Sequence, residues 1–366
     1  MASPRNIHKR LEKTYQYVSR FEKRQLELDK STRIVIFSDH HKGAKNKSDF
    51  FSGETGKENY ITYNTALDYY FEKGYLLIII GDAEELWRTS TKMIFRAHQE
   101  TLEREAQFHK EGRYIRLFGN HDLKWRKSKY TRKHFSKIDG FKNIEFNEGL
   151  IFDVKDNNQT IGELFITHGH QGSFFSDRAR WLGRGLSFLL AEPFLWLTGY
   201  NPYTPANNFN LRKKHDRAMF TWAAGKDKFL LITGHTHRPV FRSDTHIRYI
   251  RNRVASIREK LQRKPDDNKL KKQLEELNEK LEDRLRGGKD TEDTLAIGME
   301  KPAYSNTGCC CYDDGDITGL EIVYEKGNNH KDTGVFLKLI QWSRQGNPSY
   351  IPGLRSDKLK NIFNDL

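Results

Sequence analysis

Short apolar runs alternate along the first third of the chain with segments whose apolar residues recur at helical spacing. The runs at residues 34–37, 76–80 and 114–118 have the length and composition of buried strands. A segment with helical spacing, residues 1–30, precedes the first run, and two more, residues 61–71 and 93–108, separate the three runs. Strands that alternate with helices predict an α/β protein with a largely parallel sheet core.

The pattern changes beyond about residue 140. Residues 144–154 and 161–167 indicate paired strands around a turn, and residues 229–233 indicate a further buried strand. Residues 173–199 have the pattern of apolar helices, and 212–224 that of another helix. More strands are expected at 303–311, 319–324 and 336–342.

A charge-rich helical pattern at residues 247–286, broken at 264–268, predicts a helical hairpin inserted into the main domain. Such insertions are typically solvated or form oligomer contacts, and the basic stretch at 251–263 adds an anionic partner as an alternative. The expected organisation is an N-terminal helix over 1–30, a main domain over 31–245 and 296–345 with a helical cap at about 173–210, the inserted hairpin over 246–295, and a C-terminal tail over 346–366.

The charge balance is basic: 63 Lys and Arg against 49 Asp and Glu give a formal net charge of +14. A balance of this size favours an anionic partner, such as nucleic acid, a phosphorylated small molecule or an anionic lipid surface. A soluble surface rich in Lys and Arg explains it equally well.

The three cysteines are consecutive, Cys309 to Cys311. Consecutive residues on a strand point to opposite faces, so we interpret the run as a buried strand and a poor metal clamp. No disulfide framework and no signal-peptide pattern is visible, which favours a cytoplasmic protein. The longest apolar stretch, residues 186–197, is too short and too interrupted to span a bilayer.

Metal-ligating side chains follow five of the apolar strands. The carboxyl ends of strands in an α/β sheet share one edge, so residues far apart in sequence converge there. Each motif alone has an ordinary explanation, such as a turn carboxylate or a helix N-cap. Together they offer oxygen and imidazole donors, which suit Mn, Fe, Zn or similar metals. The seven candidate ligands are Asp39, His41, Asp82, Asn120, His168, His235 and His237.

This series of motifs resembles the calcineurin-like metallophosphoesterase superfamily over about residues 33–240. The resemblance implies a four-layer double β-sandwich flanked by helices, in place of a simple open sheet. It also implies two divalent metal ions, with Mn favoured and Fe, Zn or Co as alternatives. By resemblance, the first ligand set is Asp39, His41, Asp82 and His237, and the second ligand set is Asp82, Asn120, His168 and His235, with Asp82 bridging.

The implied reaction is hydrolysis of a phosphomonoester, phosphodiester or pyrophosphate by a hydroxide that bridges two metals roughly 3.5–4 Å apart. His121 follows the candidate ligand Asn120 and is the best candidate for the general acid that protonates the leaving oxygen. Asp122 is expected to orient its imidazole. The alternative is a structural histidine beside the metals.

Within the superfamily, residues 81–87 resemble the UDP-2,3-diacylglucosamine hydrolases, as does the helical segment after His168. In those enzymes this segment forms a lipid-binding cap, which suggests Arg178, Arg180 and His170 as substrate-binding residues and a peripheral membrane contact. The chain departs from that branch by carrying His121 where those enzymes carry Arg, and His170 where they carry Asp.

Three functions therefore remain open. The first is a hydrolase of a small phosphate ester, with a lipid-linked UDP-sugar pyrophosphatase as one form of it. The second is a nuclease, which is less favoured because no separate DNA-binding module is visible. The third is a scaffold that binds partners through the inserted hairpin, which the complete ligand set argues against.

Overall fold

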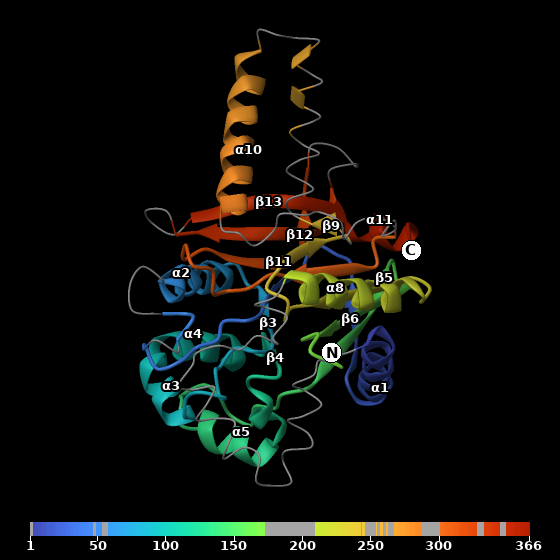
Figure 1. Cartoon of the computed structure of the whole chain (residues 1–366). Helices are drawn as coiled ribbons and strands as arrows, with labels where there is room; N and C mark the ends of the chain where they lie inside the picture. The colour runs from blue at the N-terminus through green and yellow to red at the C-terminus, as the bar shows by residue number, and fades with distance from the viewer. Residues whose placement is uncertain are drawn as a thin grey trace.

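The protein is described from a computed structural model. Its described part comprises residues 3–46, 49–52, 58–172, 209–242, 244–245, 267–286, 301–327, 333–344 and 349–366, with residues 254, 257, 258, 261 and 262. Within it the chain is a mixed α/β structure with two β-sheets and helices outside them (Figure 1).

The first sheet has six strands in the order β13-β12-β11-β2-β3-β4. Its parallel part is β2 (Arg33–Phe37), β3 (Leu76–Ile80) and β4 (Tyr114–Leu117). Its antiparallel part is β11 (Ile317–Glu325), β12 (Gly334–Ser343) and β13 (Ser349–Lys358). Strand β11 joins the two parts because it pairs with β2.

The second sheet has seven strands in the order β1-β5-β6-β7-β10-β8-β9. These are β1 (Lys23–Glu27), β5 (Gly149–Asp156), β6 (Gln159–Thr167), β7 (Phe229–Thr233), β10 (Tyr304–Thr307), β8 (Pro239–Phe241) and β9 (Asp244–Thr245). Strands β6, β7 and β10 run parallel at its centre.

Most of the helices cover the outer faces of the two sheets (Figure 1). The first sheet is covered by α2 (Asn59–Glu72), α3 (Thr91–Ala97), α4 (Gln99–Lys110), the 3-10 turn η1 (Leu123–Arg126) and α5 (Ser128–Phe135). The second is covered by α1 (Pro4–Phe21) and α8 (Phe209–Ala224). The short α11 (Leu359–Asn364) packs between the sheets.

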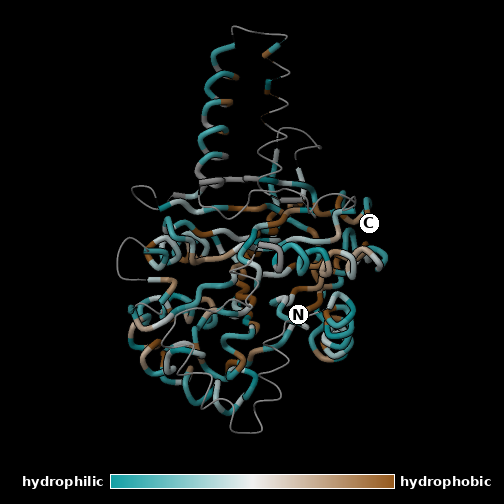
Figure 2. The backbone as a smooth tube through the Cα atoms, in the orientation of Figure 1, coloured by the Kyte–Doolittle hydropathy of each residue, from teal (hydrophilic) through white to brown (hydrophobic). Residues whose placement is uncertain are grey.

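Alternate residues of the central strands enter different layers of the core. In β2, Ile34 and Ile36 pack into the cluster between the sheets, whereas Val35 and Phe37 pack under the helices. A strand buried on both faces needs apolar residues at every position. This explains the uninterrupted apolar runs of the sequence, which follow the middle of the molecule in Figure 2.

Two predicted boundaries are wrong. The N-terminal helix ends at Phe21 and not near Lys30, because residues 23–27 form β1, which pairs in parallel with β5. The predicted C-terminal tail is instead β13 and α11, and β13 forms the edge of the first sheet. In both segments, hydrogen bonding to a sheet edge overrides a weak local pattern.

The predicted cap lies outside the described residues, apart from the start of α8 within its last two positions. The second arm of the predicted hairpin is α10 (Asn268–Arg286), which projects away from the two sheets (Figure 1). The first arm lies largely outside the described residues. In the described part of the chain, no helix is both long and apolar enough to cross a membrane.

The loop after His41 is held together by the Asp49 carboxylate. It accepts hydrogen bonds from His98 Nε2 at 2.8 Å and from the amides of Lys45, Phe51 and Ser52 at 2.8, 3.0 and 2.9 Å. Burial alone would raise the pKa of Asp49, but His98 and the loop amides lower it to about 2.

The low pKa of Asp49 makes a pH-dependent contribution to stability. The contribution is present above the unfolded pKa of about 3.9 and is lost as the pH falls through about 2. We expect Asp49→Asn to lower the free energy of unfolding near neutral pH by about 2 kcal/mol and to flatten its dependence on pH in this window. Denaturant titrations at several pH values measure this. The exposed Asp68→Asn serves as control, and equal effects of the two changes would contradict the assignment.

Candidate metal centre

The candidate ligands stand where the carboxyl ends of strands from both sheets meet. Asp39 and His41 follow β2, and Asp82 and Asn120 lie beyond β3 and β4 of the same sheet. His168 follows β6, and His235 and His237 follow β7, in the other sheet. The His235 amide donates to Asp39 Oδ2 at 2.9 Å, which joins the two sheets at this point.

The donor atoms fall into two adjoining groups. One contains Asp39, His41 and His237, and the other Asp82, His168 and His235; within each, the donor atoms lie within 4.8 Å of one another. His237 Nε2 is 3.3 Å from Asp39 Oδ1, and His168 Nε2 is 3.0 Å from Asp82 Oδ2. His168 Nε2 is also 4.0 Å from Asp39 Oδ1, so the two groups lie next to each other. Each group is a subset of one expected ligand set.

Unsatisfied buried atoms point to a missing partner at this place. Asn120 Oδ1 and His235 Nε2 are buried and lack a hydrogen-bond partner, and Asp39 Oδ1 and His168 Nε2 have none in favourable geometry beyond the ion-pair contacts given above. Such atoms are costly to bury and are rare in folded proteins. Each is the kind of oxygen or nitrogen that a divalent first-row metal accepts. The residues therefore fit a metal pair.

Backbone strain is concentrated on the same residues. Asp39, His41, Asp82, His235 and His237 all have positive φ, between 50° and 70°. For residues with a side chain this conformation costs roughly 1–3 kcal/mol each and is found mainly at functional sites. Five of the seven candidate ligands carry such strain, against six other non-glycine residues in the described part of the chain.

Two glycines allow the ligand loops to approach closely. A Cβ atom at Gly119 would overlap the Asp82 carboxylate, and one at Gly234 would overlap the carboxylate of Asp39. Asn306 of β10 supports the second loop, since its Nδ2 donates to Gly234 O at 2.6 Å. The positions directly before Asn120 and His235 therefore require glycine, because any side chain there would overlap a carboxylate of the site.

The charges of the site suit bound cations. Burial alone would raise the pKa of both Asp39 and Asp82, but the neighbouring histidines lower it, so both carboxylates are anionic. Burial and the nearby His168 and His215 hold the pKa of His235 well below its usual range, so its ring is neutral. His168 Nδ1 lies 2.9 Å from Ile80 O and donates to that carbonyl. Burial opposes a charge on the ring, but the carboxylates of Asp82 and Asp39 raise the pKa of His168 to about 9.

Glu85 was missed by the sequence interpretation. Its Oε2 accepts from His121 Nδ1 at 2.8 Å and lies 3.2 Å from His41 Nδ1. Burial opposes its charge, yet His121 and His41 lower the pKa of Glu85 to about 2. One carboxylate thus orients a candidate ligand and the candidate acid. Its only signal in the sequence was its place three residues after Asp82.

The expected contact between Asp122 and the His121 ring is not present. The Asp122 carboxylate accepts from the amides of Gly119 at 2.6 Å and Ala83 at 2.9 Å, and it ties two ligand loops together. Burial and the charges of Asp82 and Glu84 raise the pKa of Asp122 to about 7. Asp122 is therefore a loop-supporting residue, and Glu85 takes its expected place beside His121.

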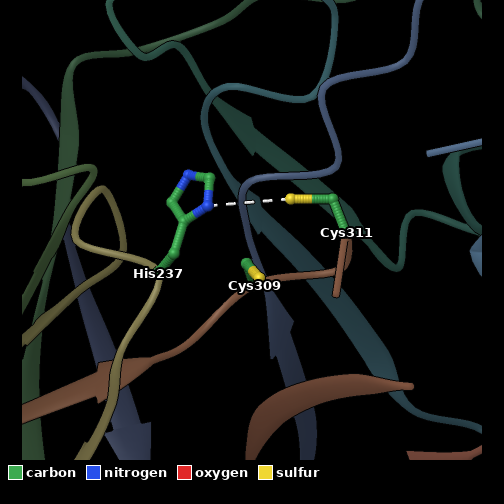
Figure 3. A group of neighbouring side chains, drawn as sticks. All are labelled: His237, Cys309 and Cys311. Carbon is green, nitrogen blue, oxygen red and sulfur yellow. Dashed lines mark hydrogen bonds between the residues drawn. The ribbon is translucent and has the colours of Figure 1, made fainter. Parts of the chain in front are cut away.

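The remaining candidates divide between described and undescribed residues. His170 is buried, with its ring centroid 5.4 Å from that of His168. Arg178 and Arg180 lie outside the described residues. Cys309 to Cys311 form a loop after β10 and not the predicted strand. In that loop Cys311 Sγ lies 3.7 Å from His237 Nδ1 (Figure 3).

Comparisons with known proteins bear on this arrangement. No curated protein matches the chain. Among solved structures, it is similar to the crystal structure of the calcineurin-like phosphoesterase YfkN from Bacillus subtilis, with 12% identity, 91% of this chain and 95% of that chain covered, and a TM-score of 0.35. The family described as Calcineurin-like phosphoesterase matches residues 32–239, which is more than half of the chain and includes all seven candidate ligands. The chain therefore belongs to the calcineurin-like phosphoesterase family.

Proposed function

We propose that this protein hydrolyses a phosphate ester with two divalent metal ions held by the first and second ligand sets. The observation that carries this proposal is the pair of adjoining donor groups whose buried atoms lack partners. Asp82 belongs to both sets and would hold both ions. When bound, the ions would activate a water molecule and neutralise charge on the phosphoryl oxygens.

His121 is proposed as the general acid. Glu85 can only accept a hydrogen bond, so Nδ1 of His121 donates to it and Nε2 is left for the leaving oxygen. Burial disfavours the imidazolium, but Glu85 and Asp82 raise the pKa of His121 and so favour the protonated ring. The Trp87 ring stacks on His121 at 3.9 Å and fixes its plane. A fixed, protonated imidazole at the centre suits proton donation.

A metal-reconstituted substrate panel tests the proposal. We expect the metal-free protein to be inactive and Mn, Zn, Co or Fe to restore hydrolysis of bis-p-nitrophenyl phosphate or p-nitrophenyl phosphate. A UDP-diacylglucosamine-like diphosphate in the panel tests the lipid-linked pyrophosphatase branch, for which the predicted cap would supply the acyl site. No turnover of any ester with any of these metals would contradict the proposal.

A nucleic-acid substrate is the second candidate, because an exposed basic strip begins three residues after His121. The strip runs over η1 and α5, and no acidic residue interrupts it before Asp139. Its exposed members are Lys124, Arg126, Lys127, Lys129, Arg132, Lys133 and Lys137. A dense row of cations beside a phosphoesterase centre suits a phosphate backbone.

Salt dependence separates this candidate from the first. If nucleic acid binds along the strip, the affinity for single-stranded DNA should fall linearly on a log–log plot against salt, and Lys129→Glu with Arg132→Glu should reduce the slope by about 1–2. Fluorescence anisotropy measures both. The control is Arg5→Glu with Lys9→Glu, two exposed charges on α1 in the opposite helix layer. Equal losses in both variants would indicate general charge attraction and rule out the strip.

A further inference from the structure

We propose that Cys309, Cys311 and Nδ1 of His237 form a third metal site, selective for a thiophilic cation such as Zn²⁺ or Cu⁺. The three side chains come from two loops, one after β7 and one after β10, and they converge in Figure 3. Their donor atoms lie within 4.8 Å of one another. No residue of this site other than His237 belongs to the two ligand sets.

The spacing of the donors suits tetrahedral coordination. Cys311 Sγ and His237 Nδ1 are 3.7 Å apart. With Zn–S of about 2.3 Å and Zn–N of about 2.0 Å, two tetrahedral ligands stand about 3.5 Å apart. The cation would therefore fit between these atoms with little rearrangement, and three protein ligands leave a fourth position for water.

The middle cysteine serves a different purpose. Cys310 is fully buried and packs in the apolar cluster beneath the helices of the first sheet. Cys309 and Cys311 turn the other way, toward His237, and Cys311 is half-buried. The thiols of Cys309 and Cys311 therefore lie on the same side of the run, and Cys311 is partly exposed to solvent.

The donor chemistry separates this site from the phosphoesterase centre. Both ligand sets consist of carboxylate, amide and imidazole groups, which suit Mn or Fe, whereas two thiolates favour soft cations. Two thiolates also neutralise a divalent ion. This matters because the site lies directly behind His237, next to the place proposed for another cation.

Sharing of His237 has a consequence that rests on the proposed function. Its Nε2 faces Asp39 at 3.3 Å, whereas its Nδ1 faces the thiols. A neutral imidazole has one nitrogen with a free lone pair. Ions at the thiol site and in the first ligand set therefore compete, and we expect saturating Mn²⁺ to weaken Cd²⁺ binding at the thiols by about tenfold or more.

Titration with Cd²⁺ or Co²⁺, followed by thiolate-to-metal charge-transfer absorbance, tests the site itself. We expect the band in the wild-type protein and in Cys310→Ala, and its loss in Cys309→Ser with Cys311→Ser. Thermal denaturation checks that the double variant folds. Should it not fold, Cys311→Ser alone, at a half-buried position, is expected to weaken Cd²⁺ binding at least about tenfold.

The outcomes are separable. No band in the wild-type protein, or an equal band in the folded cysteine variants, would overturn the third site. A band that Mn²⁺ does not weaken would overturn the sharing of His237. A protein that shows the band yet hydrolyses no ester supports the thiol site and refutes the phosphoesterase proposal.

Discussion

Asp82→Asn is expected to reduce metal-dependent ester hydrolysis by at least about a thousandfold, which corresponds to about 4 kcal/mol of transition-state stabilisation. The native carboxylate accepts from the His121 amide through Oδ1 at 2.8 Å and faces His168 Nε2 through Oδ2 at 3.0 Å. An amide keeps the shape but removes the charge and one acceptor oxygen. A side chain that belongs to both ligand sets would thereby lose its ability to bridge them.

This effect is tested by measuring the turnover of the variant together with its metal content, which elemental analysis gives. We expect the Asp82→Asn protein to hold fewer than two ions per chain after reconstitution. The same change at the surface residue Asp139, which pairs with Lys110, is the matched control and should leave both quantities unchanged. Full activity in a folded Asp82→Asn protein would disprove its place in the centre.

His121→Gln is expected to lower turnover of esters with poor leaving groups by about 10²–10⁴-fold while both metals stay bound. Esters of p-nitrophenol should be affected much less, because their leaving group departs without a proton. Glu85→Gln should cost about 10–100-fold, since it loosens His121 and His41 but removes neither. The ratio of rates for alkyl and p-nitrophenyl esters therefore reports on the acid.

His134→Gln is the control for His121, since its ring bonds to Tyr130 O on α5 away from the candidate ligands. A similar fall for both classes of ester in His121→Gln would argue for a structural role. So would loss of metal from that variant, because a residue that only donates a proton does not hold the ions.

The strand-end ligands could be predicted because two simple constraints fix them. Strands buried on both faces need continuous apolar runs, and the residues directly after them reach a common edge. Asp39, Asp82 and His168 each follow such a run. The same logic gave only a simple open sheet. The arrangement in two sheets came from family resemblance, and the pairing of β11 with β2 was not predicted.

Other features depend on how loops fold back, which one sequence does not show. Glu85 lies in the loop after β3 and contacts His121 in the loop after β4. Nothing in the sequence spacing distinguishes Glu85 from its neighbour Glu84. Asp122 stands next to His121 in sequence, yet its carboxylate turns away to two backbone amides. The predicted strand over residues 303–311 includes the cysteine run, but β10 ends at Thr307 and the three cysteines continue as a loop.

The pairing of β2 with β11 also bears on the order in which the protein is made. Residues 33–37 are synthesised long before their partner strand at residues 317–325. Until that strand emerges, β2 presents an open apolar edge, a condition that favours aggregation. A nascent chain stalled before residue 317 would lack this half of its first sheet. Chaperone occupancy on the ribosome should therefore persist until residues 317–325 have emerged.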